Sequence, residues 1–395
     1  MRNVPQLRFA GFEGEWEEEK FSENFDTTIP KNSLSRDMLT NKVTKVKNIH
    51  YGDIHKFFDN VIQSSNEKIP YIINDDLSTH ERYFLQDGDI IFTDAAEDNT
   101  AGKCVELDID DGSNIVAGLH TIPARPIKFG KYFYGFYLNS NKFHNKIIPL
   151  LEGTKVSSIS KTNLNTLSVI VPNVQEQEKI GDLFRKIDAL IEKQESKISK
   201  MEDFKKSMLQ KIFPKKGELV PDFRFDGFDG EWKKVLISEL LDYEQPTKYI
   251  VSSEDYIEEG TPVLTANKSF LLGYTNEKNI YDNGEVILID DFTLDNKYVD
   301  FPFMVKSSAL KILTEKNSDL FFVYNLLNNI DFISEGHKRH YISVVQNIKV
   351  LVPLIEEQQK IGRFFKNLDT QIETEEKLLE SYKQMKKSLL QKMFV

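Results

Sequence analysis

Two short stretches of the sequence concentrate side chains that could contact nucleic acid. The stretch GHKRHY, at positions 336–341, places two His, one Lys, one Arg and one Tyr directly after a glycine. Such a dense group of hydrogen-bond donors is suited to phosphates and to the edges of guanine. The stretch EGTKVSSIS, at 152–160, also follows a glycine with a basic residue and hydroxyls. We predict two DNA-contacting loops; the alternative, that both are ordinary solvated loops, stays open.

Motifs for catalysis are missing from the sequence. TAGKC, around position 102, lacks the upstream glycine of a phosphate-binding loop, and no glycine-rich dinucleotide motif occurs. The string DFPF at 300–303 departs from the pattern of an amino-methyltransferase, and the acidic pairs at 110–111 and 290–291 lack the carboxylate-x-Lys partner of a nuclease site. His337 and His340 have no nearby third zinc ligand. We therefore expect a non-catalytic chain that holds no metal and no cofactor.

Composition sets the class of protein. The 395 residues, 40% of them hydrophobic and 29% charged, favour two or three folded domains. A net charge of −11, with an acidic excess in 240–349, argues at first sight against nucleic acid. An acidic chain could still bind nucleic acid through one basic face, or if partner subunits supplied the cations. A lone Cys104, no long apolar run and no secretory signal pattern predict a cytoplasmic protein with no membrane contact.

The sequence contains two different internal repeats, each present in two copies. The first aligns VPQLRFAGFEGEW, from position 4, with VPDFRFDGFDGEW, from position 220. The second aligns VIVPNVQEQEKIGDLF, from position 169, with VLVPLIEEQQKIGRFF, from position 350. The stretches between the repeats, 24–168 and 240–349, show little likeness to each other. The sequence therefore predicts one duplicated scaffold that presents two different surfaces, related by an approximate two-fold axis. The two candidate DNA-contacting loops precede equivalent junctions, so we expect them in equivalent positions.

The second repeat predicts two long helices. Each begins after a short apolar strand and a proline, and each runs about 38 residues, or about 57 Å. Apolar residues recur in steps of three and four, which indicates a coiled-coil stripe. The predicted packing residues are Ile180, Phe184, Ile187, Ile191, Ile198, Ile361, Phe365, Leu368, Ile372 and Leu379. We expect the helices to pack against each other in antiparallel fashion, although each could instead cover only its own domain. Gln194 and Glu375 fall in the stripe, where a polar residue either fixes register or is solvated.

The intervening stretches predict small mixed α/β domains. Strands are expected at 89–94 and 168–172 in the first, and at 261–266, 284–290 and 309–313 in the second. One helix is expected in each, at 132–143 and 319–330. The predicted fold class is α+β: two mixed α/β domains separated by two long helices packed as an antiparallel coiled coil, with a pseudo-two-fold internal repeat.

The motifs VPxxRFxGFxGEW and VPxxxEQxKIGxxFxxxD resemble those of the specificity subunit of type I restriction-modification enzymes. The resemblance covers essentially the whole chain, and the tracts at 88–103 and 116–126 are similar to stretches of first recognition domains. It implies a first target recognition domain at 1–168, a spacer helix at 169–214, a second recognition domain at 215–349 and a second spacer helix at 350–395.

The resemblance also implies what the chain works with. Each recognition domain would read one half of a bipartite target in double-stranded DNA, with the helices as a ruler. The partners would be two methyltransferase subunits, docked on the helices, and two restriction/translocase subunits. S-adenosylmethionine, ATP and Mg²⁺ would belong to those partners, and the complex would methylate adenines in host defence.

Individual DNA contacts are predicted from basic, amide and hydroxyl side chains in both domains. In the first they are Lys103, His120, Thr121, Lys155 and Ser157; in the second they are Asn267, Lys268, Lys306, His337, Lys338, Arg339 and His340. Two rival functions remain. One is a coiled-coil scaffold whose domains bind proteins, which the acidity favours slightly. The other is a self-sufficient nuclease or methyltransferase, which the missing motifs oppose.

Overall fold

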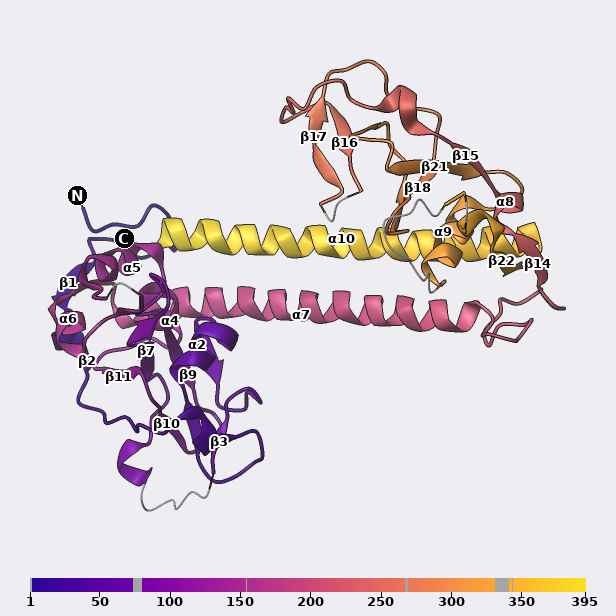
Figure 1. Cartoon of the computed structure of the whole chain (residues 1–395). Helices are drawn as coiled ribbons and strands as arrows, with labels where there is room; N and C mark the ends of the chain where they lie inside the picture. The colour runs from indigo at the N-terminus through magenta and orange to yellow at the C-terminus, as the bar shows by residue number, and fades with distance from the viewer. Residues whose placement is uncertain (1, 74–79, 154, 267–268, 331–340, 343) are drawn as a thin grey trace. The chain divides into compact units, whose positions relative to one another are not determined.

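The computed structural model describes residues 2–73, 80–153, 155–266, 269–330, 341–342 and 344–395. The chain forms two compact units, the first made of 1–194 with 378–395 and the second of 195–377. These units do not follow the linear order of the chain, because two long helices, α7 (Val174–Ile212) and α10 (Ile355–Met393), contribute to both. Figure 1 shows these two helices, α7 in magenta and α10 in yellow.

The first unit contains two larger sheets. In its five-stranded sheet the order is β2 (Phe25–Asp26), β11 (Thr121–Pro126), β7 (Ile90–Thr93), β9 (Cys104–Asp108) and β5 (Val61–Gln63). In its four-stranded sheet the order is β10 (Ile115–Ala117), β4 (Lys47–Ile49), β6 (Tyr71–Ile72) and β3 (Leu39–Thr40). Two small pairs complete it: β1 (Glu17–Lys20) with β13 (Ser168–Val171), and β8 (Ala95–Ala96) with β12 (Ser157–Ser158).

Short helices surround these sheets. They are α1 (Phe21–Asn24), α2 (Tyr51–Phe57), α4 (Phe133–Leu138), α5 (Asn141–Ile147) and α6 (Lys161–Thr166), with 3₁₀ turns at Arg36–Met38, Glu81–Tyr83 and Ile148–Leu150. The prediction of one helix over 132–143 was wrong, because Ser140 interrupts the run. Its hydroxyl accepts a hydrogen bond from the Phe143 N–H and caps α5. Helices of one or two turns, such as α2 and α6, leave too little periodicity for the sequence to reveal them.

The second unit is smaller and more purely β. Its four-stranded sheet has the order β15 (Leu241–Glu244), β21 (Leu310–Glu315), β18 (Val286–Asp290) and β19 (Asn296–Val299). A three-stranded sheet has the order β17 (Leu271–Thr275), β16 (Thr261–Leu264) and β20 (Met304–Val305), and β14 (Lys233–Leu236) pairs with β22 (Lys349–Val352). The helices are α8 (Ile237–Leu240) and α9 (Leu320–Asn328), with 3₁₀ turns at Pro246–Tyr249 and Val345–Asn347. The strands and the helix predicted here all formed.

Within each unit, α7 and α10 run antiparallel, as predicted. In the first unit Asp188 of α7 pairs with Lys386 of α10 at 2.5 Å. In the second unit the pairs are Lys197 with Glu375 and Lys205 with Asp369, both at 2.6 Å, so residue numbers rise along one helix as they fall along the other.

Part of the predicted apolar stripe packs in the domain cores: Ile180, Phe184, Ile187 and Ile191 in the first unit, and Ile361 and Phe365 in the second. Its members are buried except Ile191 and Leu379, which are half-buried. Gln194 is buried and Glu375 is paired with Lys197, so neither polar member of the stripe is simply solvated.

The repeated motifs make the same contacts in both units. Arg8 forms a two-pronged ion pair with Glu176 at 2.7 and 2.8 Å, and Arg224 does the same with Glu357 at 2.9 and 2.7 Å. Both glutamates are fully buried in the first turn of a long helix, where the helix dipole favours a carboxylate. We call these two pairs the Arg–Glu clamps. They join each opening motif to the helix that follows its own variable domain.

The C-terminal end of α10 packs in the first unit, and the C-terminal end of α7 packs in the second unit. Phe394, just after α10, packs in the first unit with ring centroids 5.8 Å from Phe133 and 5.6 Å from Phe184. Phe213, just after α7, packs in the second unit 6.1 Å from Trp232 and 5.5 Å from Phe322. The core of each unit thus requires residues from distant parts of the chain.

Candidate nucleic-acid interface

The first unit has a pocket of about 720 Å³ between α2 and the β8–β12 pair. Two residues predicted from sequence, Lys103 and His120, line this pocket together. Val156, which lies between the predicted residues Lys155 and Ser157, also lines it. The remaining lining residues are Tyr51, Gly52, His55, Ala95, Ala96, Glu97, Asp98 and Thr100. The fold therefore brings together four separate parts of the sequence, at 51–55, 95–103, 120 and 156.

His120 is held in a fixed orientation at the rim of this pocket. Its Nδ1 lies 3.0 Å from Oδ1 of Asp94, whose other oxygen pairs with Lys31 at 2.9 Å. Its backbone is left-handed, with φ of 55°, and the Tyr51 ring packs edge-on at 5.1 Å. With Nδ1 engaged by a carboxylate, Nε2 is the ring atom left for a ligand. An oriented imidazole of this kind can contact a base edge or a phosphate.

Lys103 and Thr121 are engaged within the protein. The Lys103 ammonium donates a hydrogen bond to the Ile54 carbonyl at 2.9 Å, and partial burial lowers its pKa. Thr121 is fully buried, and its hydroxyl donates to the Gly118 carbonyl at 2.6 Å. A direct contact from Thr121 to DNA would require this turn to open. Lys155 is exposed and Ser157 is half-buried, and neither of them lines the pocket.

Sequence reasoning missed Tyr51 and His55 of α2. The His55 Nε2 lies 3.0 Å from the Ala95 carbonyl, and its Nδ1 lies 3.4 Å from the Thr100 hydroxyl. The string HYGDIH, at 50–55, carries two histidines and a tyrosine at helical spacing and was the available signal. The same pocket is also lined by the small side chains Ala95 and Ala96 of β8 and by the exposed Val156. Thymine presents an apolar methyl group next to polar base edges in the major groove. A surface that has apolar groups beside polar ones can contact both.

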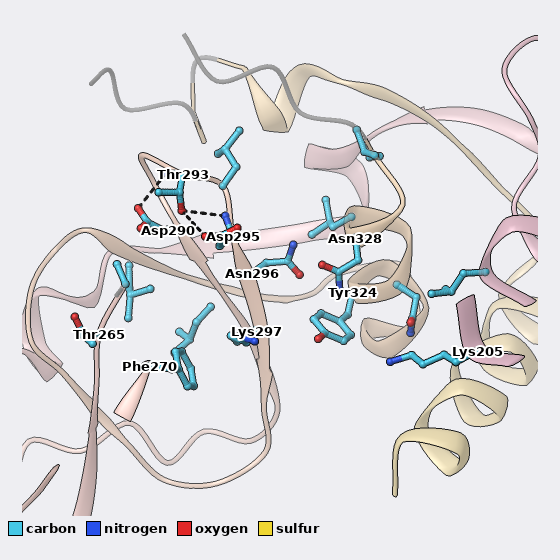
Figure 2. A pocket seen from close by; sticks show the side chains of 18 residues that line it. Lys205, Thr265, Phe270, Asp290, Thr293, Asp295, Asn296, Lys297, Tyr324 and Asn328 are labelled. Atoms are coloured by element: carbon cyan, nitrogen blue, oxygen red, sulfur yellow. Dashed lines mark hydrogen bonds between the residues drawn. The ribbon is translucent and has the colours of Figure 1, made fainter. Parts of the chain in front are cut away.

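The second unit has a pocket of about 920 Å³, drawn in Figure 2. Thr265, Ala266 and Phe270, which line it, flank positions 267 and 268 in sequence. Asn325 and Asn328 come from α9 and its end, and Lys205 comes from α7. The other lining residues are Leu209, Leu288, Asp290, Thr293, Leu294, Asp295, Asn296, Lys297, Leu310, Tyr324, Leu327 and Ile330.

Charges around this second pocket balance, and amides are prominent. Asp290 accepts the Phe292 N–H and Asp295 accepts the Thr293 hydroxyl, so both carboxylates stabilise the turn between β18 and β19. Asn296 is 9% exposed, and its Oδ1 accepts no hydrogen bond within the described residues. A pocket with two lysines, two aspartates and a buried amide suits a neutral polar group better than a phosphate.

Most DNA contacts predicted for the second domain lie outside the described residues. These are Asn267, Lys268, His337, Lys338, Arg339 and His340. Lys306 is described: it is partly exposed and lies 3.4 Å from Glu254. The predicted equivalence of the two basic loops is likewise untested, because one of them is not described.

Comparisons with known proteins agree with this arrangement. A family model, the Type I restriction modification DNA specificity domain, matches the chain twice, at 25–202 and 229–384. The Escherichia coli EcoR124I/EcoR124II specificity subunit is 44% identical over 144 residues, which is 34% of this chain and 35% of that protein. The match thus spans about a third of that relative's length. A putative MjaX specificity subunit from Methanocaldococcus jannaschii is 24% identical over 78% of each chain.

Solved structures share the fold. The S subunit of a type I restriction-modification system from M. genitalium has a TM-score of 0.66 at 17% identity, with 99% of both chains covered. A chain from a study of complex assembly and conformational transition of the type I R-M system has a TM-score of 0.51 at 14% identity, covering 96% of this chain and 97% of that one.

Two variable α/β domains, a duplicated frame and paired long helices define a DNA specificity protein with two recognition domains. The chain belongs to the family of the Type I restriction modification DNA specificity domain, and it carries that domain twice. Among the described residues, no helix is long and apolar enough to cross a membrane.

Proposed function

We propose that the chain is the non-catalytic specificity subunit of a type I restriction-modification enzyme. Each recognition domain reads one half of a bipartite target in double-stranded DNA. The observation that carries this proposal is the retention of identical frame contacts in both units around two different surfaces. A frame kept constant around two unlike pockets is what reading two different half-sites requires.

The chemistry of the complex belongs to its partners in this proposal. Two methyltransferase subunits dock on the long helices. Two restriction/translocase subunits complete the enzyme, which acts in the cytoplasm. S-adenosylmethionine, ATP and Mg²⁺ are held by those subunits. Support comes from the E. coli relative, which is named a specificity subunit, and from the missing catalytic motifs in this sequence. The net charge of −11 supports partner subunits as the main source of cations for the DNA backbone.

A scaffold that binds proteins through its two variable domains is the second candidate, favoured by the acidity of 240–349. The two functions differ in one measurement. The proposed specificity subunit gives its complex with the methyltransferase a salt-dependent preference for one DNA sequence. A protein scaffold gives the same complex no sequence preference.

We expect replacement of His120 to relax recognition at one position of the first half-site. The His120→Ala complex should lose about 1 to 3 kcal/mol of discrimination there, because an oriented imidazole no longer selects the base edge. The second half-site should be unchanged. Methylation patterns in a host expressing the variant with its methyltransferase report both half-sites.

A second histidine of the same unit provides the control. His144 bonds the Asn99 carbonyl at 2.8 Å and lies outside the pocket, so His144→Ala should leave the whole motif intact. An unchanged first half-site in the His120→Ala complex would remove His120 from base reading. It would leave the proposed function standing.

A further inference from the structure

The two pockets lie at the same place in the fold of their units. In the first unit β4 pairs in parallel with β10, and β7 pairs antiparallel with β11. In the second unit β16 pairs in parallel with β20, and β18 pairs antiparallel with β21. The first pocket is lined by residues that follow β4 and by the turn after β7; the second is lined by residues that follow β16 and by the turn after β18. Because the surrounding stretches differ in sequence, the shared place indicates a shared role.

The two pockets nevertheless present different chemistry. Asparagine side chains are prominent in the lining of the second. The first has an apolar wall, which we define as Ala95, Ala96 and Val156. Ser157 pairs with Ala96 where β12 meets β8, so Val156 is the residue next to that pairing. Val156 is 52% exposed, so packing in a core does not explain its apolar side chain.

The charged and hydroxyl groups of the first pocket favour a base over a phosphate. Two exposed carboxylates, Glu97 and Asp98, line it and repel a phosphate. The Lys103 ammonium is already bonded to a carbonyl, and the Thr100 hydroxyl donates to Asp98 at 2.5 Å. The apolar group that a base presents in the major groove is the methyl of thymine. An apolar wall in this pocket therefore suits a thymine.

Asp94 fixes the apolar wall relative to His120. The Asp94 N–H donates to the His120 carbonyl at 3.1 Å, in addition to the contact between the two side chains. The Asp94 carbonyl accepts the Ile159 N–H at 2.9 Å, just after β12. The loop of His120 and the strand that follows Val156 are thus bonded to the same residue.

Val156 itself lies on a closed turn. Glu152 and Ser158 exchange backbone hydrogen bonds of 2.9 and 2.8 Å across this turn. Gly153 has a φ of 105°, and a Cβ at that position would collide with the Val156 carbonyl oxygen. The backbone that carries Val156 is therefore set before any ligand binds.

We propose that the apolar wall contacts the methyl group of one thymine in the first half-site, with Val156 as the residue that selects it. This inference rests on the proposed function and names the base that the first pocket reads. A pyrimidine without the methyl leaves the exposed part of Val156 without an apolar partner. The preference for thymine follows from that loss of contact.

Binding of modified DNA to the complex of the full chain with its methyltransferase subunit tests this contact. The first half-site is the half of the methylated motif that is retained when residues 240–349 are exchanged for those of a relative. Each thymine of that half, on either strand, is replaced in turn by deoxyuridine, which lacks only the methyl group. At a fixed salt concentration, one replacement should weaken binding about fourfold, the usual contribution of one buried methyl group.

The same DNA molecules, bound to a Val156→Ala complex, identify the residue responsible. The difference between thymine and deoxyuridine at that position should fall below about twofold, because most of the exposed apolar wall is gone. Val43→Ala is the matched control, since Val43 is 81% exposed in the same unit and lies outside the pocket. That variant should keep the fourfold difference.

Three results would count against the contact. Equal binding of thymine and deoxyuridine throughout the first half-site, or a first half-site with no thymine on either strand, would overturn it and leave the proposed function standing. A fourfold difference that survives Val156→Ala would remove Val156 from base reading. A complex that binds all sequences alike would refute the proposed function and the contact together.

Discussion

Phe394→Ala is expected to destabilise the first unit by about 3 to 5 kcal/mol, the usual cost of emptying a buried aromatic site. Phe394 is 2% exposed and contacts the rings of Phe133, Tyr137 and Phe184. Hydrogen exchange should show lost protection in strands β7, β9 and β11, more than 250 residues away in sequence. Protection in the second unit should change much less.

Met385→Ala serves as the control for that variant, because Met385 lies near the end of α10, nine residues before Phe394, but is 41% exposed. It should cost less than about 0.5 kcal/mol. Phe213→Ala is the mirror experiment and should destabilise the second unit instead. Equal loss of protection in both units from Phe394→Ala would contradict the packing described for the first unit.

Breaking one Arg–Glu clamp is the second large effect. Arg224→Ala leaves the Glu357 carboxylate buried without its partner, and removal of one member of a buried ion pair costs about 3 to 5 kcal/mol. Arg8→Ala should cost a similar amount through Glu176. Chemical denaturation, followed by a probe in the affected unit, measures the loss.

Two further variants establish that the buried charge is the cause. Arg224→Met combined with Glu357→Gln removes both charges and should recover part of the lost stability. Lys316→Ala breaks an exposed pair with Asp242 in the same unit and should cost less than about 1 kcal/mol. An Arg224→Ala cost no greater than that of Lys316→Ala would show that the clamp does not stabilise the unit.

The repeated segments of this protein were predictable from sequence because the two copies of each repeat can be aligned with each other. The two copies of the second repeat fixed the starts of α7 and α10 after Pro172 and Pro353, and the apolar stripe indicated their pairing. The packing of Phe394 in the first unit and of Phe213 in the second was not predictable in the same way. The segment KIFP lies at the end of α7, and KMFV lies at the end of α10. Only the tertiary structure shows that the phenylalanine of each segment packs in a core.

The candidate interface was predictable only in part. Lys103 and His120 were selected as single polar residues, and the pairing of Thr93 with Thr121 in β7 and β11 brings their loops together. Asp94, which orients His120, had no motif to reveal it. Asn296 was missed because an amide in a short strand resembles any surface polar residue until its burial is known.

The methylated sequences of a host that expresses this chain with its methyltransferase subunit are the measurement to make, compared with the same host lacking the chain. Specification of a two-part target predicts N6-methyladenine at a single bipartite motif, present only with the chain. Replacing residues 240–349 with those of a relative should change one half of that motif and leave the other intact. A stable complex that adds no sequence-specific methylation would contradict the role in target recognition.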